Sequence, residues 1–367
     1  MFKKYRILKW ILVAVASLIV LLFLFGFWFM SLLPSKNAQL ESTQIKDLSY
    51  LSENKVAKRG KILAVVTSTD TMGSSGKITG YELTELARAY FVFEANGFSV
   101  DIASPLGGKS PVIIDDDDMG PFDFAFLNDS LAQYKTTHTI PIAKVNPEAY
   151  EAIYFVGGKG AMFDFPKNTT IQAIVRDYYQ SNKLIGAVCH GPAALVNVTL
   201  DNGRPMIEGK KISAFTNEEE LLLIPDAEAI FPFLLQDKLT TQGARFDEGT
   251  MYLEKISHDT NIITGQNPWS VWALAETMIQ QLGYEPKTRR ITDEENAVKI
   301  LSIYEAQGIK KAKEMIEKMA GEKKPVKRIL LAQHSIVAAM KGNIAQFSEI
   351  LSLVSHAEKY DFTSSEL

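Results

Sequence analysis

Short apolar runs alternate with amphipathic segments through most of the chain. The runs that are rich in β-branched and other apolar residues, as buried parallel strands are, cover residues 61–67, 98–103, 152–156 and 184–188. Apolar residues recur at helical spacing over residues 82–96 and 171–180, and a further helix is expected from residue 190. This alternation predicts an α/β fold, a doubly wound parallel sheet with helices on both faces.

The pattern changes after the last of these strands. Two more strands are expected over residues 211–215 and 261–264, followed by a helix over residues 269–282. Beyond residue 286 the spacing is wholly helical, with amphipathic segments at 294–307, 310–319 and 326–354. We therefore expect an α/β domain over residues 60–285 and a helical C-terminal extension over residues 286–367, whose purpose the pattern does not reveal.

One segment within the α/β domain follows neither period. Residues 111–139 contain four consecutive aspartates at positions 115–118. Consecutive carboxylates rarely converge on one cation without further ligands at defined spacing, so we interpret the segment as a surface loop or cap and predict no metal site.

The N-terminus carries the longest apolar run. Residues 7–33 contain only one charged residue, Lys9, and the run is long enough to span a bilayer. A secretory signal has an apolar region of only about 7 to 15 residues, so an uncleaved anchor over residues 1–33 is favoured. Basic residues concentrate before the run, which predicts a single-pass protein with a cytoplasmic N-terminus and an extracytoplasmic catalytic domain. Polar residues 34–59 are interpreted as a linker.

Charge and cysteine content narrow the classes of function. The net charge is -4 and the basic residues are dispersed, so no nucleic-acid-binding surface is indicated. The single cysteine, Cys189, cannot form an internal disulfide. Its presence is therefore explained either by packing in the core or by a reactive thiol.

Cys189 follows a predicted strand directly and has small residues two positions away on either side, Ala187 and Gly191. This is the pattern of a nucleophile elbow, a sharp strand-to-helix turn in which larger flanking side chains would clash. Pro192 suits the first turn of a following helix. A helix N-terminus at this point would favour the thiolate over the thiol.

Four segments in this order resemble the ThiJ/PfpI superfamily of class I glutamine-amidotransferase-like, flavodoxin-like folds, and within it the heat-shock, glyoxalase III-like branch. They are residues 80–97, 156–166, 187–192 (Ala-Val-Cys-His-Gly-Pro) and 214–220. The resemblance covers about residues 61–283. Neither the N-terminal run nor the C-terminal helices belong to the usual pattern of this branch.

The resemblance implies roles for several residues. Glu85 matches a glutamate that hydrogen-bonds the thiol, although by spacing alone Glu82 is an equal alternative. His190 matches the base beside the nucleophile, and its acidic partner falls in the run Glu218, Glu219 and Glu220, of which we favour Glu218. Gly157 and Gly158 match an oxyanion-binding loop, which the backbone N–H of His190 completes.

Two positions depart from the branch. Lys159 stands where a histidine commonly follows the glycines, and Arg88 stands where a histidine is often found on the first helix. If both cations line the pocket, an anionic or carboxylate-bearing ligand is favoured. The alternative is that either side chain points into water.

The activity that the resemblance implies is a cofactor-independent glyoxalase III, which converts a 2-oxoaldehyde such as methylglyoxal to the 2-hydroxy acid, with deglycase action as an extension. Two alternatives stay open, an amidohydrolase or peptidase of the same fold and a membrane-tethered chaperone or redox sensor. A glutamine amidotransferase would need a distant His-x-Glu pair, and His258 is followed by Asp259 and Thr260. The expected partners are a small aldehyde and, through residues 7–33, the bilayer; the sequence leaves the oligomeric state open, a homodimer included.

Overall fold

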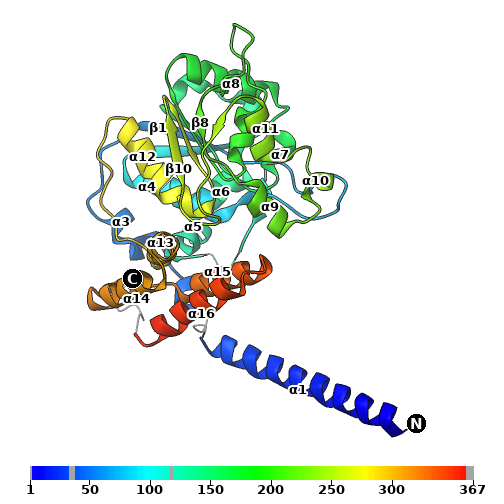
Figure 1. Ribbon diagram of the computed structural model, residues 1–367. Coiled ribbons are helices and arrows are strands. Elements are labelled where there is room, and N and C mark those ends of the chain that lie inside the picture. The colour runs from blue at the N-terminus through cyan, green and yellow to red at the C-terminus, as the bar shows by residue number, and fades with distance from the viewer. Residues whose placement is uncertain (1, 33–37, 116–118, 361–367) are drawn as a thin grey trace.

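A computed structural model describes residues 2–32, 38–115 and 119–360, and its centre is a seven-stranded sheet (Figure 1). The strand order is β10-β11-β7-β6-β1-β3-β5, and every neighbouring pair is parallel except β10 and β11. The strands are β1 (Gly60–Val65), β3 (Phe98–Ser104), β5 (Ile140–Pro141), β6 (Ala152–Phe155), β7 (Leu184–Val188), β10 (Ile256–Asp259) and β11 (Ile262–Gly265). The predicted α/β fold with a mostly parallel sheet is confirmed.

Both faces of the sheet are covered by helices, as the continuous apolar runs predict. In β1, Ile62 and Ala64 contribute to one core, with α4 (Leu83–Ala95) and α12 (Val271–Gln281). Leu63 and Val65 contribute to the opposite core, with α8 (Thr169–Gln180). Because successive side chains of a strand point to opposite faces, a strand covered on both sides must be apolar at nearly every position.

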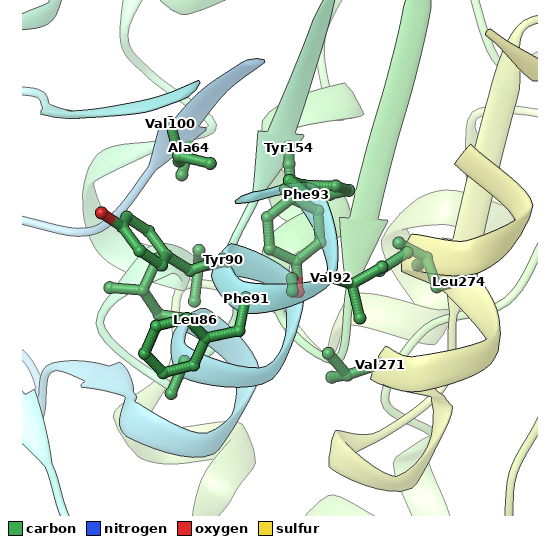
Figure 2. Packing of buried hydrophobic residues seen from close by; sticks show 14 of the residues in the cluster. Ala64, Leu86, Tyr90, Phe91, Val92, Phe93, Val100, Tyr154, Val271 and Leu274 are labelled. Carbon is green, nitrogen blue, oxygen red and sulfur yellow. The ribbon is translucent and has the colours of Figure 1, made fainter. Parts of the chain in front are cut away.

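Helix α4 is buried on nearly all sides, because it lies between the sheet and its neighbouring helices. Figure 2 shows Phe93 of this helix beside Tyr154 of the sheet, while Val92 faces Val271 and Leu274 of α12. The rings of Phe93 and Tyr154 meet edge to face at 5.7 Å between centroids. A carboxyl group on this helix, such as that of Glu85, is therefore held in an apolar surrounding.

Some elements differ from the sequence-based expectation. The strand expected over residues 211–215 is only β8 (Lys211–Ile212), which pairs with β9 (Arg245–Phe246) outside the main sheet. Edge strands β5 and β10 were not expected, since β5 has only two residues and β10 ends in polar residues. Short edge strands carry too few apolar positions for a period-2 pattern to show.

The interpretation of residues 111–139 as a surface loop or cap without regular structure is wrong in part. The segment contains α5 (Pro121–Asn128) and α6 (Ser130–Thr137), whose apolar side chains join the core that contains α4. Of the acidic run, residues 116–118 lie outside the described residues.

The remaining short elements connect these layers. They are β2 (Tyr81–Glu82), β4 (Val112–Ile113), α7 (Ala161–Asp164), α9 (Asn217–Leu223), α10 (Ala227–Ile230), α11 (Leu235–Thr241), and the 3₁₀ turns η2 (Ile142–Lys144), η3 (Pro147–Ala149), η4 (Gly191–Leu195) and η5 (Pro268–Ser270).

The N-terminal helix α1 (Phe2–Leu32) extends away from the rest of the molecule (Figure 1). The prediction that residues 7–33 span a membrane is wrong, because across the described residues no helix combines the length and apolar character that a bilayer crossing requires. The predicted single-pass localisation is wrong with it, and the predicted bilayer contact has no support.

The expected linker also differs from the structure. Residues 38–52 form α2 (Ala38–Glu41), η1 (Ile45–Asp47) and α3 (Ser49–Ser52). Leu48 and Tyr50 are buried in the core beside α4 and α5, and the ring of Tyr50 meets that of Phe122 at 6.0 Å. This part of the segment therefore packs on the α/β domain.

The C-terminal region is helical, as expected, and forms a third core of its own. Its helices are α13 (Asp293–Gln307), α14 (Ile309–Gly321), α15 (Arg328–Met340) and α16 (Ile344–Glu358). The amphipathic segment expected over residues 326–354 forms two helices, because the chain turns at Gly342 with a φ of +73°. Figure 1 shows these helices lying together beneath the α/β domain.

A buried ion pair attaches these helices to the α/β domain. The Lys327 Nζ donates to the backbone oxygen of Met119 at 2.6 Å and to Glu294 Oε1 at 3.1 Å. Burial acts to raise the pKa of Glu294, but Lys327 opposes it and holds that pKa below its ordinary value. The carboxylate therefore stays charged in the interior because Lys327 accompanies it.

We expect Lys327→Met to destabilise the fold by about 3–5 kcal/mol, because it leaves the Glu294 charge buried without its cation. Urea unfolding followed by circular dichroism measures the loss. Lys324→Met is the matched control, since Lys324 and its partner Glu322 are largely exposed. A loss below about 1 kcal/mol for Lys327→Met would contradict the role of this pair.

Candidate active site

Cys189 lies on a sharp turn between β7 and η4. Its φ is +57°, a left-handed conformation that non-glycine residues rarely adopt. Two backbone hydrogen bonds hold it, from the Cys189 N–H to Gly265 O at 2.9 Å and from the Phe215 N–H to Cys189 O at 3.0 Å. A Cβ at Gly191 would lie 2.3 Å from Phe155 O, so the turn tolerates no side chain there. The strained backbone is thus fixed by its surroundings.

The turn brings the side chains of two adjacent residues together. Cys189 Sγ lies 3.2 Å from Nδ1 of His190, and His190 Nε2 lies 2.5 Å from Oε2 of Glu220. A carboxylate at Nε2 fixes the tautomer in which that nitrogen carries the proton, so Nδ1 is free to accept the proton of the thiol. The imidazole also packs against the rings of Phe215 and Phe231.

Glu220, and not the favoured Glu218, is the acid that reaches His190. Glu218 is 56% exposed and forms an ion pair with Lys341 at 2.7 Å. The two glutamates are two positions apart on α9, which places them about 200° apart around the helix axis. Glu219 caps the helix by accepting from the Thr216 N–H. The pattern Thr-x-x-Glu could have identified Glu219 as the capping residue, but not which face of α9 meets the histidine.

Glu85 is fully buried beside the thiol. Its Oε2 accepts a hydrogen bond from the Gly157 N–H at 2.8 Å. Burial raises the pKa of Glu85 well above its ordinary value, the Glu82 charge adds to this, and a hydrogen bond with Cys189 opposes it. Burial thus favours the protonated form of this carboxyl, which can donate a proton toward sulfur or toward a ligand bound there. The structure brings Glu85 to the thiol, whereas Glu82 precedes α4 as its N-cap.

The two glycines of the expected oxyanion loop have different surroundings. A Cβ at Gly157 would lie 2.4 Å from Glu85 Oε2 and 2.8 Å from Cys189 Cβ, and its N–H is occupied by Glu85. Gly158 has a φ of +98°. Among the described residues, no hydrogen-bond acceptor is found for the N–H groups of Gly158 and His190. An oxyanion role stays a prediction for these two groups and is disfavoured for the Gly157 N–H.

The two cations that depart from the branch pattern are placed differently. Lys159 is half-buried, and its charge acts on Cys189, Glu85 and Glu220. Arg88 is buried and pairs with Asp123 at 3.1 Å, over the ring of Trp269. The prediction that Arg88 contacts the ligand is therefore not supported, because its guanidinium is directed to α5.

The thiol is not activated by a helix N-terminus, as the sequence suggested. The residues after Cys189 form only the five-residue 3₁₀ turn η4, which is too short to align the peptide dipoles of a full α-helix. Burial raises the pKa of the Cys189 thiol well above its ordinary value, Glu85 raises it further, and Lys159 opposes both. The resting thiol is therefore protonated, and a base must take its proton before it can act as a nucleophile.

Comparisons with known proteins identify relatives of this chain. The model of the DJ-1/PfpI family matches residues 77–214. HSP31 of Saccharomyces cerevisiae, named a glutathione-independent glyoxalase, is 30% identical over 241 residues, which cover 62% of this chain and 99% of that protein. The protein hsp3101 of Schizosaccharomyces pombe, also named a glutathione-independent glyoxalase, is 32% identical over 240 residues, which cover 61% and 97%. The chain belongs to the DJ-1/PfpI family.

Solved structures show the same relationship for this DJ-1/PfpI member. The Rapid Encystment Protein 24 KDa of Francisella tularensis superposes with a TM-score of 0.58 at 35% identity, covering 61% of this chain and 99% of that one. Glyoxalase III of Candida albicans superposes with a TM-score of 0.55 at 26% identity, covering 60% and 96%. More than a third of this DJ-1/PfpI chain therefore has no counterpart in these relatives.

In this DJ-1/PfpI chain, Gly157→Ala is expected to destabilise the fold by about 1–3 kcal/mol, because the added methyl group collides with Glu85 and Cys189. Urea unfolding measures the change. Gly321→Ala is the control, since a Cβ there meets nothing within 4 Å. Equal stability of the two variants would show that Glu85 does not need this close approach.

The acid that orients His190 can be identified through the single thiol of the chain. Glu220→Gln is expected to slow alkylation of Cys189 by iodoacetamide on the order of 100-fold, because His190 loses its orienting carboxylate. Glu218→Gln should slow it only about three- to fivefold, since Glu218 does not touch His190 and only a half-exposed ion pair is lost. Mass spectrometry reports the rate directly, as no other cysteine is present. Equal alkylation rates in the two variants would show that Glu220 does not orient His190.

Proposed function

We propose that this protein is a cofactor-independent glyoxalase of the glyoxalase III type, which converts a 2-oxoaldehyde such as methylglyoxal to the corresponding 2-hydroxy acid. The observation that carries the proposal is the hydrogen-bonded series Cys189, His190 and Glu220 with the buried carboxyl of Glu85 beside the thiol. The similarity to relatives that are named glutathione-independent glyoxalases supports it.

In the first step His190 Nδ1 takes the thiol proton, and the Cys189 sulfur adds to the aldehyde carbon of the substrate. A carbon–sulfur bond forms, and the carbonyl oxygen receives a proton to give a hemithioacetal. Glu220 stabilises the imidazolium that forms transiently on His190. Lys159, whose charge lies near the thiol, stabilises the negative charge on sulfur and then on oxygen.

In the second step a base removes the hydrogen from the former aldehyde carbon, and the adjacent ketone oxygen is protonated to give an enediol. Protonation of the second carbon, with loss of the hydroxyl proton from the first, gives the thioester of the 2-hydroxy acid. The first carbon is thereby oxidised and the second reduced, so no external oxidant is needed. Glu85 and His190 are the groups placed to move these protons. Water then cleaves the thioester, releases the acid and restores the thiol.

The burial of the site favours a small substrate over a peptide. Cys189 is only 5% exposed and His190 only 1%. A peptidase must admit an extended chain to its nucleophile, whereas methylglyoxal needs little more than the space of a few waters. His258, the sequence candidate for an amidotransferase histidine, is exposed on edge strand β10 and hydrogen-bonds to Thr260 O. These features disfavour the amidohydrolase and peptidase alternatives.

The test is the formation of lactate from methylglyoxal by the purified full-length chain, without glutathione and in the presence of a metal chelator. Wild-type protein should produce lactate. Cys189→Ala should lose at least about a thousandfold in kcat/KM, because the covalent step is removed. Glu314→Gln is the control and should leave the rate nearly unchanged, since Glu314 is an exposed residue of α14. The glyoxalase proposal is falsified if wild type and Cys189→Ala form lactate at the same rate.

A further inference from the structure

The position of Glu220 depends on contacts made by the residue before it. Glu219 is fully buried, and its carboxylate accepts hydrogen bonds from Thr216 N at 2.9 Å, Tyr252 N at 2.7 Å, and the side chains of Gln266 at 3.0 Å and Asn267 at 3.1 Å. These bonds fix the first turn of α9, from which Glu220 reaches His190.

Tyr252 is the residue through which this turn meets the C-terminal helices. Besides its N–H bond, its hydroxyl donates to Glu219 O at 2.9 Å. Its φ of +53° is strained for a tyrosine, so packing must hold it there. Its ring lies 6.1 Å from that of Phe215, which contacts His190. Tyr252 also packs against the third core, built mostly from α13 to α16.

Two residues of the α15 region approach the same part of the α/β domain. His334 is buried; burial lowers its pKa to about 4, and the Tyr252 backbone opposes this shift, so a neutral ring lies against the Tyr252 loop. Lys341, at the C-cap of α15, forms the ion pair with Glu218 in the first turn of α9. The Lys341 cation lies at the negative C-terminal end of α15, and the Glu218 anion lies at the positive N-terminal end of α9. Both placements are favourable. Figure 1 shows one end of α15 lying beneath α9.

We propose that the C-terminal helices are part of the catalytic apparatus: through Tyr252 and Lys341 they hold α9 in the position from which Glu220 orients His190. Tyr252 and Lys341 are positioning residues, because they act on the thiol only through Glu220 and His190. The inference rests on the role of Glu220 in the proposed function. It explains why helices outside the family pattern pack against the elements of the site rather than elsewhere on the sheet.

The experiment exchanges the charges of the ion pair in the full-length chain and measures alkylation of Cys189 by iodoacetamide. Lys341→Glu should slow alkylation about tenfold, because two like charges now push α9 away from α15. Adding Glu218→Lys should restore the rate to within about threefold of wild type. Lys311→Glu is the matched control, since its partner Glu314 lies on the same helix α14, and its rate should not change.

A second pair of variants tests the tyrosine. Tyr252→Phe keeps the ring but removes the bond to Glu219 O, and it should slow alkylation about fivefold. Tyr304→Phe removes a comparable bond to Glu349 within the C-terminal helices and should leave the rate unchanged. Circular dichroism at the assay temperature establishes that all variants are folded.

The outcomes are decisive in either direction. A slower Lys341→Glu that the exchanged pair restores supports positioning. The positioning proposal is overturned if Lys341→Glu is alkylated faster than wild type or within about threefold of its rate. It is also overturned if adding Glu218→Lys does not restore a slowed rate, or if Glu220→Gln leaves the rate unchanged. Alkylation needs no aldehyde, so the alkylation rates test the positioning of α9 independently of the glyoxalase activity. Failure of the glyoxalase proposal would instead appear as absence of lactate.

Discussion

The burial of a thiol, an imidazole and two carboxyl groups at one point is the constraint on which the rest of this structure depends. Polar groups in the interior are costly unless each is hydrogen-bonded. Here Cys189 contacts His190, which contacts Glu220, while Glu85 accepts from the Gly157 N–H. The left-handed turn at Cys189 is what allows neighbours in sequence to meet, and the glycines nearby are what allow the surrounding backbone to approach.

The same burial decides the chemistry of the site. In water a cysteine is partly ionised near neutral pH, but here burial and Glu85 keep the thiol protonated. In the mechanism that we propose, the nucleophile is therefore generated within the site, by a proton transfer to His190 that Glu220 supports. Glu85 differs from Glu220 only in surroundings: burial raises the pKa of Glu85, whereas His190 overcomes burial and lowers the pKa of Glu220. Two chemically equal side chains thus favour different protonation states.

Glu85 and Glu220 lie on separate helices, α4 and α9. The C-terminal helices make contacts near both of these helices. Near α4, Lys327 bonds to Met119 O and Glu294 beside the buried pair of Arg88 and Asp123. At α9 the contacts run through Tyr252 and Lys341. An α/β sheet places the strand ends that form a site, but helices that lie across these ends can fix the relative positions of side chains that no single strand carries.

The sequence alone determined what depends on near neighbours: the strand and helix alternation of the sheet, the small residues around Cys189, and the helical character of residues beyond 286. Only the tertiary structure decided that Glu220 and not Glu218 meets His190, that Arg88 pairs with Asp123, and that Tyr50 joins the core. It also overturned the membrane span expected over residues 7–33. Periodicity shows that a helix has two faces, but which face meets which partner depends on residues distant in sequence, whose approach no local pattern encodes.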